Sequence, residues 1–333
     1  MKSAYEVECR AKEGKHINTI KEDLEALVDK RLHWTLLTLP ILGIVIFTIL
    51  PLVFMICMAF TSYSKVGDHL TIFHWVGLKN FSTVLGMGNS IGKTFWSVLG
   101  WTLIWAVLAT FLNYILGMIL AIVINRKTTR IKGFWRFCFM LSAAIPQFVS
   151  LLLMRTMLKD NGLINNLLVQ AGLISSPLPF LTNATWARAT VVIINLWVGI
   201  PFTMMQVTGI LQNIPGELYE AARVDGAGPV TIFFKITLPY MLFVTTPYLI
   251  TTFTGNINNF NVIYLLTAGA PVPVGATAGK TDLLVTWLYK LTVDLQYFNV
   301  GAVVGILTFV ILAVVSLITY RNTGSYKNEE GFQ

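Results

Sequence analysis

The residues best suited to make a functional contact lie in a short polar loop between the fourth and fifth apolar stretches of the chain. They combine small side chains with carboxylates: Glu220, Ala221, Ala222, Asp225 and Gly226. If this segment is helical, the alanines leave one face nearly bare, so a cleft in another protein can receive the helix closely. The Glu220 carboxylate can then meet a cation in that cleft. Such residues suit docking rather than catalysis, and the alternative is an ordinary charged loop that joins two spans.

Helix start and stop signals surround these residues. Pro215 suits a first helical turn, where its missing N–H has no partner to lose, and Glu217 places negative charge near the positive end of the helix. Asp225-Gly226 predicts the end of this helix, and Pro229 can open a second one. The sequence therefore predicts a helix-turn-helix hairpin within a coupling loop at about 212–238.

The composition excludes an ordinary water-soluble domain. Of the 333 residues, 55% are hydrophobic and 12% are charged, and the mean hydropathy is +0.68. A helix needs about 20 apolar residues to cross a bilayer, and six stretches qualify: about 35–62, 96–124, 134–158, 186–211, 239–266 and 299–320. We expect an all-α integral membrane protein with six transmembrane helices over 35–321. Residues 1–34 form a cytoplasmic segment too long and charged for a removable signal peptide, and 322–333 form a cytoplasmic tail.

The net charge of +8 predicts an orientation in the membrane rather than a nucleic-acid partner. Most of the 24 Lys and Arg residues fall on one side of the six spans if the N-terminus is cytoplasmic. Positive charge favours the cytoplasmic side, so both termini and the Glu220 loop should face the cytoplasm. The helical spacing of Ile20, Leu24, Leu27 and Val28 is consistent with a helix along the membrane surface or with a solvated tail helix.

Helix-breaking and amide residues inside the spans predict a polar cavity. The breaks are expected at Pro146, at Gly199 with Pro201, at Pro247, and at Gly255 with Asn256. Backbone groups freed at such positions need protein or water partners instead of lipid. Amides in the spans strengthen this prediction, notably Asn195, Gln206, Asn256, Asn258 and Asn259. Amides are costly against hydrocarbon but can hydrogen-bond a neutral polyhydroxylated ligand such as a sugar. For any single asparagine, the alternative is a hydrogen bond between helices.

The sequence contains no complete motif for catalysis, nucleotide binding or metal binding. Gly92-Lys93-Thr94 and Gly279-Lys280-Thr281 end like phosphate-binding loops, but the glycine required five positions earlier is Met87 in one and Val274 in the other. The histidines and cysteines form no ligand pattern. We therefore expect a non-catalytic chain without cofactor or metal, with any ATP hydrolysed by a separate protein.

Two sets of motifs resemble a known family. The sequence EAAxxxG from Glu220, then nine residues and Ile236-Thr237-Leu238-Pro239, resembles the coupling signature of permease subunits of ATP-binding-cassette importers. Asn258–Thr267 and Ala278–Val285 resemble the MalF-type subunit of maltose and maltodextrin importers, and the similarity runs over about 35–321. The resemblance implies a type I permease fold with a cytoplasmic coupling helix, in a bacterial cell membrane. It also implies four partners, namely a second MalG-type permease, two cytoplasmic ATPase subunits and an external sugar-binding protein.

The same resemblance implies a sugar site midway through the membrane. Matching motif by motif, the following residues fall on sugar-contacting positions: Asn195, Val198, Gly199, Phe202, Asn256 and Asn259. Three positions of the expected site depart from the family pattern, with Phe202 in place of a tyrosine, Gly255 in place of an aromatic residue and Gln147 in place of a serine. These departures point to a different or longer oligosaccharide than maltose.

Together, these observations predict a permease subunit that provides half of an alternating-access path for an oligosaccharide, maltodextrin-like or a related glycan. The main alternative is an ion-coupled secondary sugar transporter, which would need ionisable groups at mid-membrane. Arg155 and Arg188 lie near span ends, and no Asp, Glu or His lies at mid-membrane. An inert membrane scaffold is a further alternative, although a scaffold does not need broken, polar spans.

Overall fold

The computed structural model describes residues 12, 14, 29, 32–66, 69–70, 73–126 and 128–321. The expectations for residues 1–34 and 322–333 therefore lie almost entirely outside the described residues. The chain divides into two compact units, Met1–Cys57 and Met58–Gln333, which are described separately.

One apolar helix accounts for most of the described part of the first unit. It consists of α3 (Leu32–Ile44), the π-helical turn η1 (Val45–Ile49) and α4 (Leu50–Ala59), whose last two residues belong to the second unit. Residues Leu36–Ala59 are long and apolar enough to cross a membrane. This helix corresponds to the first expected span.

The second unit consists of helices and one very short strand pair. Its elements, in chain order, are β1 (Lys65–Val66), β2 (His69–Leu70), α5 (Lys79–Leu85), α6 (Ser90–Asn125), α7 (Lys132–Ala144), α8 (Gln147–Met157), α9 (Leu163–Gln170), α10 (Ala184–Gln212), α11 (Gly216–Val224), α12 (Pro229–Ile232), η2 (Phe233–Thr237), α13 (Leu238–Ile257), α14 (Phe260–Leu266), α15 (Leu284–Tyr289), η3 (Lys290–Asp294) and α16 (Phe298–Arg321). The two strands pair antiparallel, with Lys65 opposite Leu70.

The expected spans match these helices. Five helices are long and apolar enough to cross a membrane: Leu36–Ala59, Ser90–Asn125, Ala184–Gln212, Pro229–Leu266 and Phe298–Arg321. The pair α7 and α8 passes the same test together but is bent by 83°. Counting this pair as one broken span gives the six predicted spans within the described residues.

The bend between α7 and α8 has a clear cause in the sequence. Pro146 disfavours helical geometry at the preceding residue, and Ile145 accordingly has an extended backbone at φ −77° and ψ 130°. Pro146 is itself extended at ψ 127°. The predicted break at Pro146 is therefore confirmed, and it leaves two half-helices at a steep angle.

The other three predicted breaks are wrong. α10 continues through Gly199 and Pro201, and α13 continues through Pro247 and the Gly255-Asn256 pair. A buried Pro201 is tolerated inside a helix when neighbouring helices pack around it, since the segment loses only one backbone hydrogen bond. The fifth span instead breaks at Asn258-Asn259, where Asn259 caps the start of α14 through Val262 N–H.

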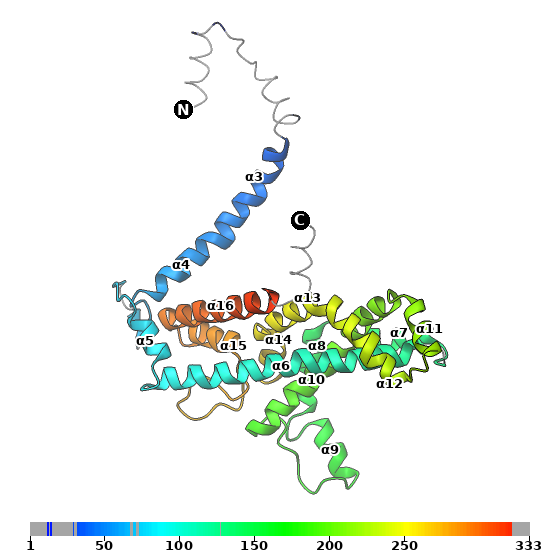
Figure 1. The fold of residues 1–333 in the computed structure, drawn as a ribbon. Coiled ribbons are helices and arrows are strands. Elements are labelled where there is room, and N and C mark those ends of the chain that lie inside the picture. The colour runs from blue at the N-terminus through cyan, green and yellow to red at the C-terminus, as the bar shows by residue number, and fades with distance from the viewer. Residues whose placement is uncertain are drawn as a thin grey trace. The chain divides into compact units, whose positions relative to one another are not determined.

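The core of the second unit is built on α6. This helix, drawn in cyan in Figure 1, packs mainly against α10 and α13. Its first half contributes Trp101 and Trp105 to one buried cluster, and its second half contributes Tyr114 and Met118 to another. The two clusters therefore share one helix as a common wall.

Glycine lets α6 approach α10 closely. A Cβ atom at Gly117 would lie 2.8 Å from the Cβ atom of Thr203 and 3.2 Å from the backbone nitrogen of Met204. Small residues at such crossings let helix backbones pack tightly in membranes, where lipid offers no hydrophobic drive for association. The crossing therefore leaves no room for even one methyl group.

We expect Gly117→Ala to destabilise the protein by about 1–3 kcal/mol, because the added methyl group overpacks a contact with the stiff side chain of Thr203. Thermal unfolding of the purified protein in detergent measures this change. Gly100→Ala on the same helix is the matched control, since nothing lies within 4 Å of its added Cβ. There, the better helix propensity of alanine should leave stability unchanged or raise it by up to about 1 kcal/mol. Equal melting temperatures for the two variants would contradict the tight crossing.

Candidate functional site

The predicted coupling helix is α11, and its end has the geometry that the sequence signals require. The N–H of Gly226 donates to the carbonyl of Arg223 at 3.1 Å, and the N–H of Ala227 donates to the carbonyl of Ala222 at 2.9 Å. Gly226 has φ +78°, in the left-handed region. These features make up a Schellman motif, which satisfies the last carbonyls of the helix. Pro215 lies one position earlier than expected, as the residue before the first helical residue, Gly216.

The exposed side of the coupling hairpin carries the predicted contact residues. Glu220, Ala221, Asp225 and Gly226 are exposed, and Ala222 is half-buried. Within the described part of the chain, no ion pair involves Glu220. Exposed apolar side chains lie nearby: Leu218, Val224, Val230 and Phe234. A face that combines an unpaired carboxylate with small and apolar groups is suited to contact with another protein.

The opposite side of α11 is attached to the membrane helices. The hydroxyl of Tyr219 lies 3.2 Å from the Thr237 hydroxyl, in the last residue of η2, directly before α13. Tyr219 also packs against the buried cluster that contains Met204 and Met241. Sequence analysis missed this residue, although a large side chain one position before the Glu-Ala-Ala run was a usable signal. Tyr219 thus connects the exposed hairpin to α10 and α13.

The fifth-span helix begins within the same hairpin. Pro229 is the first residue of α12, as predicted, and α12 continues through η2 into α13. Pro229–Leu266 is one helical stretch apart from the break at Asn258-Asn259. The hairpin is therefore continuous with a membrane helix.

The bend between α7 and α8 forms a pocket of about 350 Å³ against the middle of α10. Its lining includes four predicted sugar-site residues: Gln147, Val198, Gly199 and Phe202. The remaining lining residues are Ser142, Ala143, Ile145, Pro146, Ser150 and Trp197. None of these ten side chains is ionisable, so the pocket offers hydroxyls, an amide and aromatic faces to a neutral ligand.

Trp197 and Phe202 provide the aromatic surfaces of this pocket, which we call the membrane pocket. Their relative exposures are 41% and 55%, so both rings have large uncovered faces. Ser142 donates its hydroxyl hydrogen to the Phe139 carbonyl, which leaves its oxygen lone pairs available as acceptors. Sequence analysis did not single out Trp197, Ser142 or Ser150. The tryptophan is adjacent to the predicted Val198-Gly199 pair, and the two serines flank the predicted Gln147.

The other four predicted residues lie outside the lining of the membrane pocket. Asn256 donates to the Thr110 hydroxyl at 3.0 Å, and its backbone carbonyl accepts from Trp105 Nε1 at 3.0 Å. The side chain of Asn259 caps α14. Both asparagines therefore join or cap helices in this conformation. Gly255 is exposed, and a Cβ added there would meet nothing within 4 Å.

Asn195 and Asn113 are buried behind the membrane pocket. Asn195, one helical turn before Gly199, is 6% exposed, and its side-chain nitrogen has no partner among the described residues. The side-chain oxygen of Asn113 is likewise unpartnered there, and it would lie 2.7 Å from a Cβ added at Gly199. Glycine at 199 thus makes room for an amide between α6 and α10. A buried amide without a hydrogen-bond partner destabilises the folded protein, and a water molecule or a ligand hydroxyl would supply the missing hydrogen bond.

Acidic residues are absent from the membrane helices. No Asp or Glu lies in any of the six spans, including the α7 and α8 pair. Within the described residues, no group of three or more His, Cys, Asp or Glu side chains could hold a metal ion. The arrangement combines neutral hydrogen-bonding groups within the membrane helices with an exposed hairpin face of small and apolar groups.

Comparison with known proteins agrees with this arrangement. A protein-family model described as binding-protein-dependent transport system inner membrane component matches residues 113–323. The galactooligosaccharides transport system permease protein GanP of Bacillus subtilis is 35% identical over 99% of this chain and 79% of its own length. The maltodextrin transport system permease protein MdxF of the same organism is 36% identical over 95% of this chain and 75% of its own length.

Longer relatives and solved structures extend the comparison. The maltose/maltodextrin transport system permease protein MalF of Escherichia coli is 35% identical over 74% of this chain and 49% of its own length. A bacterial alginate ABC transporter, solved in complex with a periplasmic protein bound to alginate pentasaccharide, has a chain with the same fold. The TM-score is 0.71 at 24% identity, over 89% of this chain and 94% of that one. Because the family model spans more than half of the sequence and the B. subtilis relatives align along nearly all of it, this chain belongs to the family of binding-protein-dependent transport system inner membrane components.

Proposed function

We propose that this chain is the permease subunit of an ATP-binding-cassette importer that moves a neutral oligosaccharide, a maltodextrin-like or related glycan. In this proposal it pairs with a second, MalG-type permease and with two cytoplasmic ATPase subunits. An external sugar-binding protein delivers the substrate. Relatives named for galactooligosaccharide and maltodextrin transport support the substrate class.

The observation that carries the substrate class is the membrane pocket. It combines two aromatic faces, Trp197 and Phe202, with the hydroxyls of Ser142 and Ser150 and the amide of Gln147. Sugars present apolar C–H faces and rings of hydroxyls, so they bind well to aromatic surfaces bordered by neutral donors and acceptors. A pocket of about 350 Å³ is large enough for one or two sugar rings at a time.

The proposed site also includes Asn195, Asn256 and Asn259, which lie outside this pocket in the present conformation. The amide nitrogen of Asn195, one helical turn before Gly199, has no partner among the described residues, whereas Asn256 and Asn259 hold helices together. An alternating-access cycle moves helices relative to one another, so a second conformation can expose these amides to the sugar. Gly255 can likewise face the sugar in such a conformation, because a Cβ added there would meet nothing within 4 Å among the described residues.

The coupling step follows from the attachment of α11 on both sides. ATP-driven closure of the ATPase subunits would move the exposed Glu220-Ala221-Ala222 face. Tyr219 and the continuous helix from Pro229 would pass this movement to α13, and the buried cluster around Met204 would pass it to α10. The membrane pocket lies on α10, so its access changes with the position of the hairpin.

An ion-coupled secondary transporter is disfavoured by the composition of the spans. Such carriers need ionisable groups inside the membrane to bind and release the driving ion. No acidic residue lies in any span, and the pocket lining is uncharged. Sugar uptake by this chain alone, driven by a proton or sodium gradient in liposomes, would overturn the importer proposal.

The first prediction from this proposal concerns the end of the coupling helix. Gly226→Val forces a β-branched residue into left-handed geometry, which costs at least about 1–2 kcal/mol. We expect this variant to reduce sugar uptake and ATPase copurification at least severalfold, because the end of the coupling helix is distorted. Gly228→Val is the matched control in the same turn, because φ is −73° there and nothing lies within 4 Å. Reconstituted transport and pull-down measure both variants. Wild-type uptake by Gly226→Val would remove the hairpin from the coupling mechanism.

The second prediction concerns the link between Tyr219 and Thr237. Tyr219→Phe and Thr237→Val each remove a hydrogen bond whose net value is about 0.5–1.5 kcal/mol. We expect each to raise the number of ATP molecules hydrolysed per sugar transported by about two- to tenfold. The double variant should resemble the single variants, since both remove the same interaction. Additive effects in this cycle, measured in proteoliposomes, would show that the two hydroxyls act independently.

The third prediction concerns the aromatic faces of the membrane pocket. Trp197→Ala and Phe202→Ala should each raise the KM for sugar about five- to tenfold, equivalent to about 1–1.4 kcal/mol of lost stacking. Assembly with the ATPases should remain intact. Phe309→Ala is the control, because Phe309 is an exposed aromatic residue of α16 outside the pocket. Unchanged uptake kinetics in both pocket variants would exclude this pocket as the sugar site.

A further inference from the structure

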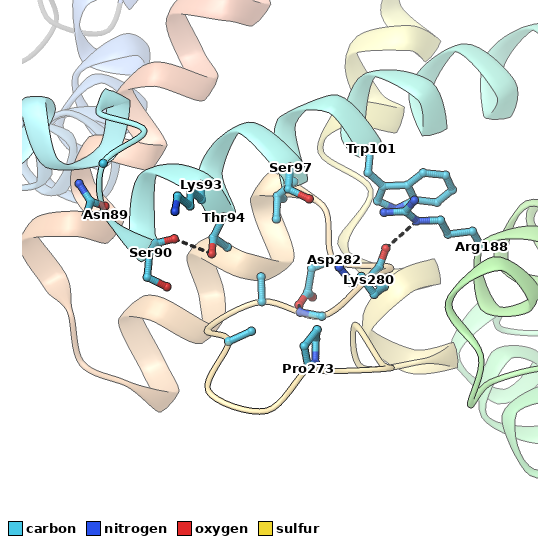
Figure 2. A pocket seen from close by; sticks show the side chains of 15 residues that line it. Asn89, Ser90, Lys93, Thr94, Ser97, Trp101, Arg188, Pro273, Lys280 and Asp282 are labelled. Carbon is cyan, nitrogen blue, oxygen red and sulfur yellow. Dashed lines mark hydrogen bonds between the residues drawn. The ribbon is translucent and has the colours of Figure 1, made fainter.

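A second pocket, of about 450 Å³, lies at the opposite end of the second unit from the coupling hairpin. It is formed by the start of α6, the start of α10 and the loop between α14 and α15. Figure 2 shows Arg188 from α10 lying over Trp101 from α6, beside the loop that carries Lys280 and Asp282. The hairpin follows the far end of α10, so this pocket faces the other side of the membrane, which the proposed orientation makes extracytoplasmic.

Positive charge dominates the lining of this pocket. Lys93, Arg188 and Lys280 all contribute to it, and the single acidic residue of the lining is Asp282. Asp282 is fully buried and already neutralised, because its carboxylate lies 2.6 Å from Lys290 Nζ and accepts from the Gly279 N–H and the Thr286 hydroxyl. No other carboxylate among the described residues pairs with the three cations. Like charges that gather without a counter-ion repel one another, so an external anion would stabilise the pocket.

Arg188 is fixed in a position that leaves its binding face free. Its guanidinium lies 4.5 Å from the centre of the Trp101 ring, and its Nε donates to the Lys280 carbonyl at 2.9 Å. Its two terminal nitrogens have no hydrogen-bond partner within the described residues. An arginine held in this way presents a rigid fork of N–H donors, which matches the two oxygens of a carboxylate.

The loop that carries Lys280 is held firmly against α6. Trp101 Nε1 donates to the Thr281 carbonyl at 3.2 Å, and the Thr281 and Thr267 hydroxyls lie 2.8 Å apart. The Leu284 N–H donates to the Thr102 hydroxyl at 3.1 Å. The pocket is therefore formed before any ligand arrives, which lowers the entropic cost of binding. The first turn of α6, which lines the pocket at Ser90 and Lys93, adds the positive end of a long helix.

We propose that this pocket, which we call the cationic pocket, binds an acidic side chain of the external sugar-binding protein and so fixes its position on the permease. The proposal rests on the proposed function. A carboxylate from a docked protein fits better than a transported sugar, because Arg188 lies about 15 Å along α10 from Val198 in the membrane pocket. Lys93 and Lys280 are exposed at the rim, where charges steer protein encounter and fix register.

The test measures the affinity of the whole transporter for its cognate binding protein. The transporter, with its second permease and ATPases, is held in lipid nanodiscs. Lys93→Glu combined with Lys280→Glu reverses the rim while Arg188 and its contacts remain. At 50 mM NaCl, we expect this variant to bind the binding protein about tenfold or more weakly than the wild-type transporter does. At 500 mM NaCl, the affinities of variant and wild type should differ by about threefold or less, because salt screens the rim charges. Lys79→Glu combined with Lys159→Glu is the matched control. Both lysines are exposed on the same side and lie outside the cationic pocket, so affinity should stay within about twofold of wild type.

A charge-swap experiment identifies the partner group. Replacing the acidic residues of the binding protein one at a time by lysine should yield one variant that restores affinity for the Lys93→Glu, Lys280→Glu transporter.

Unchanged affinity of that transporter for the wild-type binding protein, with ATPase assembly intact, would overturn the assignment of the cationic pocket and leave the proposed function standing. A wild-type transporter that binds neither ATPases nor any external binding protein would overturn the proposed function itself. A uronate-containing oligosaccharide that binds without the binding protein, and is lost in the rim variant alone, would assign the pocket to an acidic glycan instead.

Discussion

The close contact between α6 and α10 is the packing on which the arrangement of both pockets depends. Gly117 and Gly199 let the two helices approach so closely that Thr203 and Asn113 fill the space a side chain would need. In a bilayer, where lipid is as apolar as the helix surface, such close packing is what keeps helices together. The contact fixes Trp101 beneath Arg188 at one end of α6 and places the middle of α10 against the α7 and α8 bend.

The other end of α6 joins three helices through one side chain. Asn125 donates to the Thr208 hydroxyl on α10, accepts from Arg136 on α7 at 2.6 Å, and accepts at its backbone carbonyl from Lys132. Thr208 is buried, so the amide hydrogen bond joins the helices inside the protein. The two cations of α7 therefore hold the half-helix that leads to the membrane pocket. In the proposed coupling step, a shift of α10 driven from the hairpin would also act on this junction.

Much of the fold could be predicted from the sequence, because membrane helices are marked by their length and apolar composition. The spans, the end of α11 at Gly226 and the break at Pro146 follow from local rules about hydropathy, left-handed geometry and proline. Two of the other predicted breaks are absent where neighbouring groups hold the segment, and α13 also continues through the exposed Pro247 and Gly255. Pro201 is buried, and Asn256 is hydrogen-bonded to Thr110. Which helices pack around a residue is a tertiary property that local patterns do not encode.

The candidate site shows the same limit. Sequence motifs identified Gln147, Val198, Gly199 and Phe202, which meet in one pocket although they come from two helices. They did not identify Trp197, Asn113 or Tyr219, whose importance depends on what each side chain faces. The three cations of the cationic pocket were visible in the sequence only as scattered lysines and an arginine near a span end. Their grouping depends on a loop that folds back to α6 through Thr281 and Leu284.

The uncharged lining of the membrane pocket has an electrical consequence. When a binding site that contains ionised groups switches access from one side of a membrane to the other, it moves charge through the field, at about 2.3 kcal/mol per elementary charge for every 100 mV. In the proposed cycle, a membrane pocket lined by serine, glutamine, tryptophan and phenylalanine would itself move no charge as its access switches around a neutral sugar. The membrane voltage would then have no direct effect on the switch in access of this pocket, so ATP-driven uptake through it should persist in a depolarised cell.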